Sequence, residues 1–138
     1  MPGIFRRGIK ETVKYLDPLV NNFGLKSVLL FPVVDSECKS IEYGTDKEKN
    51  PVLGLIPILK ETFPSIFILV DVCLCGFNPT GHCSTFDLIT GQMDNDRSLM
   101  ELDKIALAYA SAGADVIAPS DMMDSRIGSI RTKLNQHR

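Results

Sequence analysis

Residues 64–83 read PSIFILVDVCLCGFNPTGHC, and the predicted architecture can be built outward from them. We predict a strand over Ile66–Leu74, because this run is short, apolar and rich in branched side chains. Val28–Val34 is a second such run, typical of a strand that is covered on both faces of a parallel sheet. Asp115–Ala118 predicts a third strand.

Helical patterns alternate with these strands. The expected helical segments are Ile9–Gly24, with a kink or an early end at Pro18; Val52–Thr62, capped by Asn50; Asn95 or Asp96 to Gly113; and Met123–Leu134, with Ile127, Ile130 and Leu134 on one side. Strands that alternate with helices are parallel and joined by crossovers, so the predicted fold class is α/β. Three strands make a thin sheet with two open edges, which is typical of one part of a larger structure.

Two segments are harder to assign. Gly54 and Pro57 together cost a helix interior on the order of 4 kcal/mol relative to alanine, so the second helix is either rescued by packing or broken at Pro57. The polar residues Asp35 to Lys49 predict an exposed loop. The whole chain, residues 1–138, is interpreted as a single incomplete domain.

Composition excludes several classes of function. Fifteen Lys and Arg residues against 17 Asp and Glu residues leave a net charge of −2, which provides no basic field for nucleic acid. The apolar runs are far shorter than the ~20 residues that a bilayer requires, and the N-terminus does not resemble a secretory signal. Four clustered cysteines do not form a disulfide scaffold. We therefore expect a cytoplasmic protein that contacts neither nucleic acid nor membrane.

The cysteines form the first candidate site. Side chains alternate along a strand, so Asp71, Cys73 and Cys75 are expected on one face. The glycines and proline of residues 76–81 then turn the chain and can return Cys83 to the end of that strand. Three thiolates suit Zn²⁺, and three protein ligands leave a fourth position open, as in catalytic zinc sites. Small buried hydrophobic cysteines remain the other interpretation, because C-x-C-x7-C is not a standard zinc-finger spacing.

Other polar residues near the predicted strand ends have two interpretations each. His82 is either an exposed loop residue, a donor that supports the metal ligands, or a ligand of another ion. Asp121 and Asp124 follow the third strand and can orient a substrate, or they can simply favour the start of a helix that Ser120 caps. Cys38, in the charged loop, is interpreted as unpaired.

These motifs together resemble a known family. DVCLC at 71–75, GHC at 81–83 and ALAYASAGADVIAPSDMMDSR at 106–126 resemble the zinc-dependent delta-aminolevulinic acid dehydratases, also called porphobilinogen synthases. ETFPSIFILV and the opening MPGIFRRGIKETVKYLDPLV are similar as well, so the resemblance covers nearly the whole chain.

The resemblance implies a fold and an activity. Members of this family are (β/α)8 TIM barrels and lyases of heme biosynthesis, which condense two molecules of 5-aminolevulinate to porphobilinogen with loss of two waters. It implies that Cys73, Cys75 and Cys83 hold the catalytic Zn²⁺, and that His82 matches a histidine associated with a further zinc in some members. Asp71 and Asp124 match carboxylates near the substrate pocket. The family forms homo-octamers through an N-terminal arm.

Departures from the family pattern limit what carries over. The family reacts through two Schiff-base lysines, in motifs of the type SYSAKF and VKP, and no lysine of this chain lies in such a motif. The arm and the first barrel strand have no counterpart either. Pro32, Ser84 and Ser125 stand where the family has glycine, which affects loop geometry. The loop at 35–49 looks shortened.

We therefore expect the N-terminal half of a barrel that carries the zinc-binding part of the site, has no dehydratase activity alone, and is poorly soluble or oligomeric. One alternative is an inactive zinc-binding fragment that associates with full-length subunits. Another is a thiol redox switch that uses Cys73 and Cys75.

Overall fold

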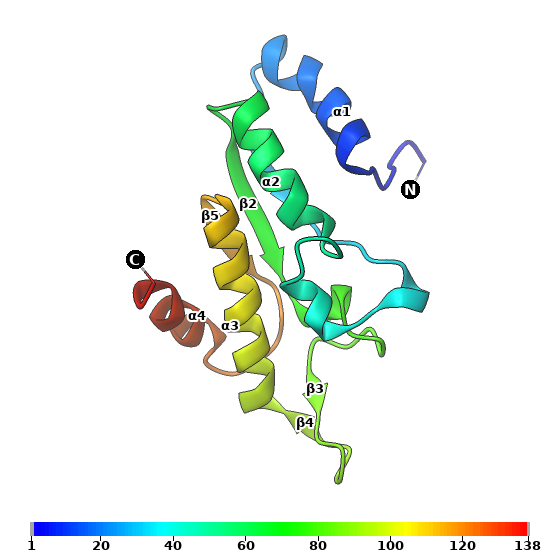
Figure 1. Cartoon of the computed structure of the whole chain (residues 1–138), viewed down its shortest axis with the longest axis vertical. Coiled ribbons are helices and arrows are strands. Elements are labelled where there is room, and N and C mark those ends of the chain that lie inside the picture. Colours follow the sequence, from blue (N-terminus) through cyan, green and yellow to red (C-terminus); the bar gives the residue numbers. More distant parts are fainter. Residues whose placement is uncertain (1, 138) are drawn as a thin grey trace.

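A parallel sheet with helices over one of its faces forms the framework of the protein. The computed structural model describes residues 2–137. Its elements are α1 (Ile9–Asn21), β1 (Ser27–Leu30), the 3-10 helices η1 (Ser36–Cys38) and η2 (Ile41–Gly44), α2 (Pro51–Thr62), β2 (Phe67–Val72), the 3-10 helix η3 (Leu74–Gly76), β3 (Thr85–Phe86), β4 (Met93–Asp94), α3 (Asn95–Ala112), β5 (Val116–Pro119) and α4 (Arg126–Asn135). Helices α2 and α3 lie side by side in front of β2 (Figure 1).

The sheet has the predicted parallel topology. Its strand order is β1-β2-β5, with Leu29 in register with Leu69 and Leu69 in register with Val116. The α/β class and the alternation of helices and strands are thereby confirmed. The short antiparallel hairpin of β3 and β4 was not predicted, because each of its strands is only two residues long.

The prediction that the first strand is covered on both faces is wrong. Strand β1 ends at Leu30, and Pro32, which has no N–H to donate to a sheet, follows two residues later. Leu29 is 47% exposed and Phe31 is 61% exposed. Because α2 and α3 cover one face of the sheet, Ile68 and the other β2 residues that face them are buried, while Phe67 on the opposite face is 47% exposed.

Helix α2 is continuous, so packing does rescue it. Asn50 caps its first turn by accepting a hydrogen bond from the Val52 N–H at 3.1 Å, and Pro51 occupies the first position, where no intrahelical N–H is needed. Pro57 lies within the helix on its exposed side. The opposite side buries five apolar residues: Val52, Leu53, Leu55, Ile56 and Leu59.

The other helices differ from the prediction mainly at their ends. Helix α1 runs past Pro18 to Asn21, and α3 is capped by Asp94, which accepts the Arg97 N–H at 2.9 Å, instead of by Asn95 or Asp96. Gly113 ends α3 as expected, with φ +107°.

Helix α4 begins later than predicted, at Arg126 instead of Met123. Its N-cap is Ser125, with φ +66°, and not Ser120. Ile130 is buried, but Ile127 is 60% exposed, so the expected apolar side of this helix is only partly covered.

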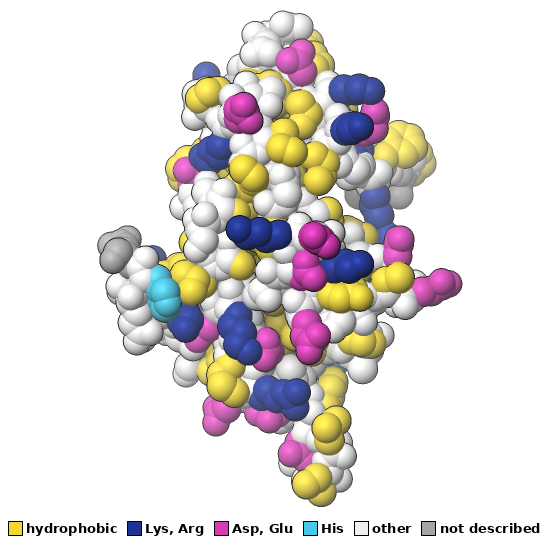
Figure 2. All heavy atoms as spheres, viewed as in Figure 1, with side chains coloured by type: hydrophobic (Ala, Val, Ile, Leu, Met, Phe, Trp, Pro, Cys, Tyr) yellow, Lys and Arg dark blue, Asp and Glu magenta, His cyan; other side chains and the backbone are white. Residues whose placement is uncertain are grey.

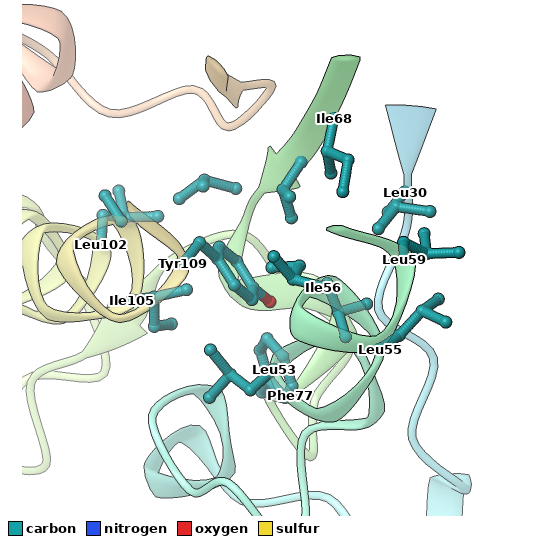
Figure 3. Packing of buried hydrophobic residues seen from close by; sticks show 14 of the residues in the cluster. Leu30, Leu53, Leu55, Ile56, Leu59, Ile68, Phe77, Leu102, Ile105 and Tyr109 are labelled. Atoms are coloured by element: carbon teal, nitrogen blue, oxygen red, sulfur yellow. The ribbon is translucent and has the colours of Figure 1, made fainter. Parts of the chain in front are cut away.

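The core lies between α2, α3 and the sheet (Figure 3). Ile56 from α2, Ile105 and Tyr109 from α3, and Ile68 from β2 are fully or almost fully buried there. The segment before α2 is also more ordered than the predicted exposed loop, since it contains η1 and η2 and buries Gly44. The amide of Asn50 donates to the Gly44 carbonyl at 2.8 Å, which attaches this segment to the core.

The surface carries mixed charge on the face that Figure 2 shows, with acidic and basic side chains interspersed. At one end of the molecule the β3–β4 hairpin projects (Figure 1), and Leu88 and Ile89 at its tip are more than 90% exposed. Among the described residues, no helix has the length and apolar character needed to cross a membrane.

Candidate metal centre

Three cysteine sulfurs meet beyond the end of the central strand. The Sγ atoms of Cys73, Cys75 and Cys83 all lie within 4.8 Å of one another. Cys73 directly follows β2 and keeps an extended backbone, Cys75 lies in η3, and Cys83 returns from the loop that follows. The predicted strand alternation does not reach Cys75, because β2 ends at Val72. The 3-10 turn brings Cys75 to the site instead.

The burial of the sulfurs controls their protonation. Cys73 is 3% exposed, and Cys75 and Cys83 are partly buried. Burial raises the pKa of the Cys73 thiol far above its ordinary value, because an isolated thiolate there loses its hydration. Burial also raises the pKa of Cys83, and the charges of Cys75 and Asp121 add to that effect. A cation that binds here must therefore displace protons from the thiols.

The donor set fits a thiophilic divalent cation. At the usual Zn–S length of about 2.3 Å, tetrahedral geometry places two sulfurs about 3.8 Å apart, which the separations in this cluster allow. Thiolate ligands select zinc and related soft cations over magnesium or calcium. Cys73, Cys75 and Cys83 can therefore hold one such ion and leave a fourth position open. Cys38 is exposed and lies outside the cluster, as expected.

The loop that carries Cys83 is held by a buried asparagine that the sequence analysis did not single out. Asn78 is 4% exposed. Its Nδ2 donates to the carbonyls of His82 at 3.1 Å and Ser84 at 2.7 Å, while its Oδ1 accepts the N–H and hydroxyl of Thr80. The Asn-Pro-Thr-Gly sequence is a turn signal that could have identified this residue.

His82 supports the same loop. Its Nδ1 accepts the Ser84 N–H at 3.1 Å, and its ring lies edge-on to Phe86 with centroids 5.1 Å apart. It is not among the residues whose donor atoms converge in the cluster. Ser84 is buried and donates its hydroxyl to the Thr85 carbonyl. Within residues 2–137, positive φ in a non-glycine residue occurs only at Ser125, so Ser84 does not need the conformational freedom of glycine.

Of the two aspartates that follow the third predicted strand, Asp121 and Asp124, it is Asp121 that lies near the cysteines. Its side chain is buried, with Oδ1 accepting the Met123 N–H at 2.8 Å and Oδ2 lying 3.5 Å from Arg126 Nε. Burial raises the pKa of Asp121, and the charge of Asp71 raises it further, although Met123 and Arg126 oppose the shift. Oδ2 accepts no hydrogen bond from the described residues.

The structure places Asp71 and Asp124 in different surroundings. Asp71 is half-buried on β2, in register with Ala118 of the neighbouring strand. Asp124 is exposed, and its backbone N–H donates to Asn95 Oδ1 at 2.9 Å. Asp71 and Asp121 therefore lie near the cysteines, whereas Asp124 joins the segment between β5 and α4 to the start of α3.

Comparison with known proteins identifies the fold and its relatives. A family model described as delta-aminolevulinic acid dehydratase matches residues 1–138. The chain belongs to this family. The delta-aminolevulinic acid dehydratase of Dictyostelium discoideum is 41% identical over 139 residues, and that of Pongo abelii is 40% identical. Each alignment covers 99% of this chain and 41% of the relative.

A solved structure agrees with these relatives. The delta-aminolevulinic acid dehydratase (porphobilinogen synthase) of Toxoplasma gondii ME49, in complex with the reaction product porphobilinogen, superposes with a TM-score of 0.91 at 36% identity. The match covers 99% of this chain and 39% of that one, so the partial-barrel fold expected from the sequence is confirmed for the matched part. The chain spans about two-fifths of the length of the dehydratases it matches.

Proposed function

We propose that this chain forms the metal-binding part of a porphobilinogen synthase of heme biosynthesis, a lyase that condenses two molecules of 5-aminolevulinate with loss of two waters. The observation that carries the proposal is the convergence of the Cys73, Cys75 and Cys83 sulfurs in a chain of this family. The product complex of the Toxoplasma gondii relative supports the substrate class. A cytoplasmic location agrees with four cysteines that are all free.

The residues of the chain have distinct roles in this proposal. When bound by the three thiolates, Zn²⁺ supplies Lewis-acid chemistry at its open fourth position. Asp121 is a buried carboxyl group beside the cluster, and burial together with the neighbouring Asp71 raises its pKa above the ordinary value. Asp71 adds a negative charge on the open side of the sheet, which suits the orientation of an amino group. Asn78 and His82 keep Cys83 in place.

The chain carries none of the covalent part of the reaction. Schiff-base formation requires a lysine amine positioned against a substrate carbonyl, and none of the lysines of this chain matches the family motifs that supply one. We therefore expect purified residues 1–138 to produce no porphobilinogen in a colorimetric assay with added zinc. Measurable turnover would contradict this part of the proposal.

Metal analysis tests the zinc site directly. Reduced protein that is saturated with zinc and then desalted is expected to retain about one ion per chain. Single substitutions Cys73→Ser, Cys75→Ser and Cys83→Ser should each lower that content, whereas Cys38→Ser, a matched control at an exposed cysteine outside the cluster, should not. Wild-type protein without bound zinc, or equal loss in all four variants, would overturn the proposed site.

The exposed side of the sheet favours a second candidate function, in which this chain is an inactive zinc-binding subunit of a larger synthase assembly. Leu29 and Phe67 are each 47% exposed on the sheet face opposite the helices, and a parallel sheet is normally covered on both faces. Affinity purification of a complete synthase that was co-expressed with tagged chain tests this function. Recovery of the synthase in stoichiometric amount is expected, and its absence would exclude this association.

The closeness of the three sulfurs also suits a thiol redox switch. Thiol titration distinguishes a zinc site from a redox switch. Zinc protects Cys73, Cys75 and Cys83 from alkylation until a chelator is added, while exposed Cys38 reacts in both states. Reversible loss of two thiols upon mild oxidation of the zinc-loaded protein would favour the switch.

A further inference from the structure

Lys39 reaches the cysteine cluster from a distant part of the chain. Its Nζ donates a hydrogen bond to the carbonyl oxygen of Cys75 at 2.8 Å, although the two residues are 36 positions apart. The Lys39 side chain is half-buried and follows directly after η1. The contact therefore joins the segment before α2 to the turn that carries one of the three sulfurs.

The three cysteines are held in place by different contacts. Cys73 follows β2, whose last carbonyl, that of Val72, accepts the Ser120 N–H at 3.2 Å. Cys83 is held through the hydrogen bonds of Asn78 and His82 to the residues beside it. Cys75 lies in a single 3-10 turn of three residues, which the Phe77 and Asn78 N–H groups close by donating to the Leu74 carbonyl, and Lys39 adds a side-chain contact to the Cys75 carbonyl itself.

The turn that contains Cys75 is contacted at two points by the segment between β1 and α2, from which Lys39 projects. A Cβ atom added to Gly76 would lie 3.2 Å from the Pro32 carbonyl oxygen, so the backbone at Pro32 contacts the turn on one side. Lys39 holds it at the Cys75 carbonyl. Further along, Gly44 packs against Ile105 of the core, which limits how far the segment can move.

Charge gives the contact a second effect. A divalent cation bound by three thiolates leaves a net charge of −1 at the centre. The carboxyl groups of Asp71 and Asp121 lie close enough to interact, and Asp121 also acts on Cys83, while Arg126 Nε lies 3.5 Å from Asp121 Oδ2. An ammonium group bound to a ligand's own carbonyl lowers the electrostatic cost of that charge in partly buried surroundings.

We propose that Lys39 is a positioning residue of the metal centre: its ammonium group fixes the backbone of Cys75 and offsets the negative charge of the thiolate-bound cation. The proposal rests on the zinc site proposed above. Residues that hold metal ligands from outside the coordination sphere typically change metal affinity by about 10–100-fold when they are replaced.

The test measures zinc affinity by competition with a chromophoric chelator. Lys39→Met removes the charge and the hydrogen bond while keeping the length of the side chain, and we expect at least about tenfold weaker binding. Lys39→Arg keeps the charge and a donor, and it should restore most of the affinity. Lys47→Met, at an exposed lysine of the same segment, is the matched control and should bind as the wild type does.

A second measurement separates positioning from general destabilisation. At saturating Co²⁺, Lys39→Met should change the d–d absorption bands of the thiolate-bound metal, whereas Lys47→Met should not. Circular dichroism of the metal-free variants should show unchanged helix content.

Each remaining outcome decides against a specific claim. Wild-type affinity in Lys39→Met, or equal weakening in the methionine and arginine variants, would overturn the role of Lys39. Failure of the wild-type chain to bind zinc would instead overturn the proposed function on which this role depends.

Discussion

The side-chain amide of Asn50 lies 2.9 Å from the hydroxyl oxygen of Tyr109, and both side chains are fully buried. The same amide donates to the Gly44 carbonyl, and its oxygen caps α2 at Val52. One asparagine thus connects η2, α2 and α3 inside the core. Burial raises the pKa of the Tyr109 hydroxyl, so this group stays neutral and hydrogen-bonded over the physiological range.

Asn50→Ala should lower the free energy of unfolding by about 2–4 kcal/mol, because it removes a helix cap and leaves buried polar groups without a partner. Urea unfolding measures the change. Tyr109→Phe removes only the hydroxyl group at the other end of the contact and should cost about 1 kcal/mol. A loss below 0.5 kcal/mol for Asn50→Ala, on the order of an ordinary surface substitution, would contradict the connection.

Gly44 and Gly54 should respond to alanine in opposite directions. A Cβ atom at Gly44 would overlap the Cδ1 atom of Ile105, so Gly44→Ala should destabilise the protein by about 1–3 kcal/mol through overpacking. At Gly54, in the middle of α2, the nearest side-chain atom is 3.4 Å away. Gly54→Ala should therefore raise stability by up to ~1 kcal/mol, since alanine favours the helix. Thermal unfolding of the two variants is sufficient, and equal shifts would disprove the packing difference.

Ser125→Gly should stabilise the protein by about 1 kcal/mol. Ser125 has φ +66°, a conformation that costs a non-glycine residue about 1–2 kcal/mol, and glycine adopts it without that cost. Ser111→Gly, at an exposed position within α3, is the matched control and should destabilise by a few tenths of a kcal/mol. The idea fails if both variants shift the urea midpoint in the same direction.

Asp115 should make stability depend on pH in the acid range. Burial opposes its ionisation, but hydrogen bonds from the Ile68 N–H and from Lys60 outweigh this and lower the pKa of Asp115. A lowered pKa in the folded state contributes stability above the unfolded value of about 3.9, and this contribution is lost as the pH falls through the folded pKa.

Asp115→Asn should therefore be less stable than the wild type at pH 7, by no more than about 1 kcal/mol because solvent screens this exposed ion pair, and should lose less stability between pH 5 and pH 3. Urea unfolding at a series of pH values measures both effects. Glu61→Gln, at an exposed carboxylate of α2, should leave the pH profile unchanged. Identical profiles for Asp115→Asn and the wild type would refute the assignment.

The order of helices and strands could be predicted because apolar periodicity depends on neighbours along the chain. The ends of elements could not. Helix α2 tolerates Gly54 and Pro57 because one of its sides is buried by residues from other elements. Helix α4 begins at Arg126, directly after Ser125, whose left-handed backbone no sequence pattern indicates. The exposure of Leu29 follows from which face of the sheet the helices cover, which the composition of a strand does not encode.

At the candidate site, the cysteines could be found from their type and closeness in sequence, although strand alternation was the wrong reason for expecting Cys75 there. Asn78 lies in an Asn-Pro-Thr-Gly turn signal, which predicts the turn but not the hydrogen bond to the Ser84 carbonyl. Lys39 carried no signal at all, since its contact with Cys75 depends on the path of a segment that looked like an exposed loop. Long-range contacts of this kind come from tertiary structure rather than from local pattern.

The apolar side of the sheet that bears Leu29 and Phe67 has a practical consequence for handling the protein. Attraction between such surfaces grows with warming and with sulfate or phosphate salts, and weakens in the cold. Dilute, chilled buffers of low sulfate content should therefore keep preparations clear, and ammonium sulfate should precipitate them early.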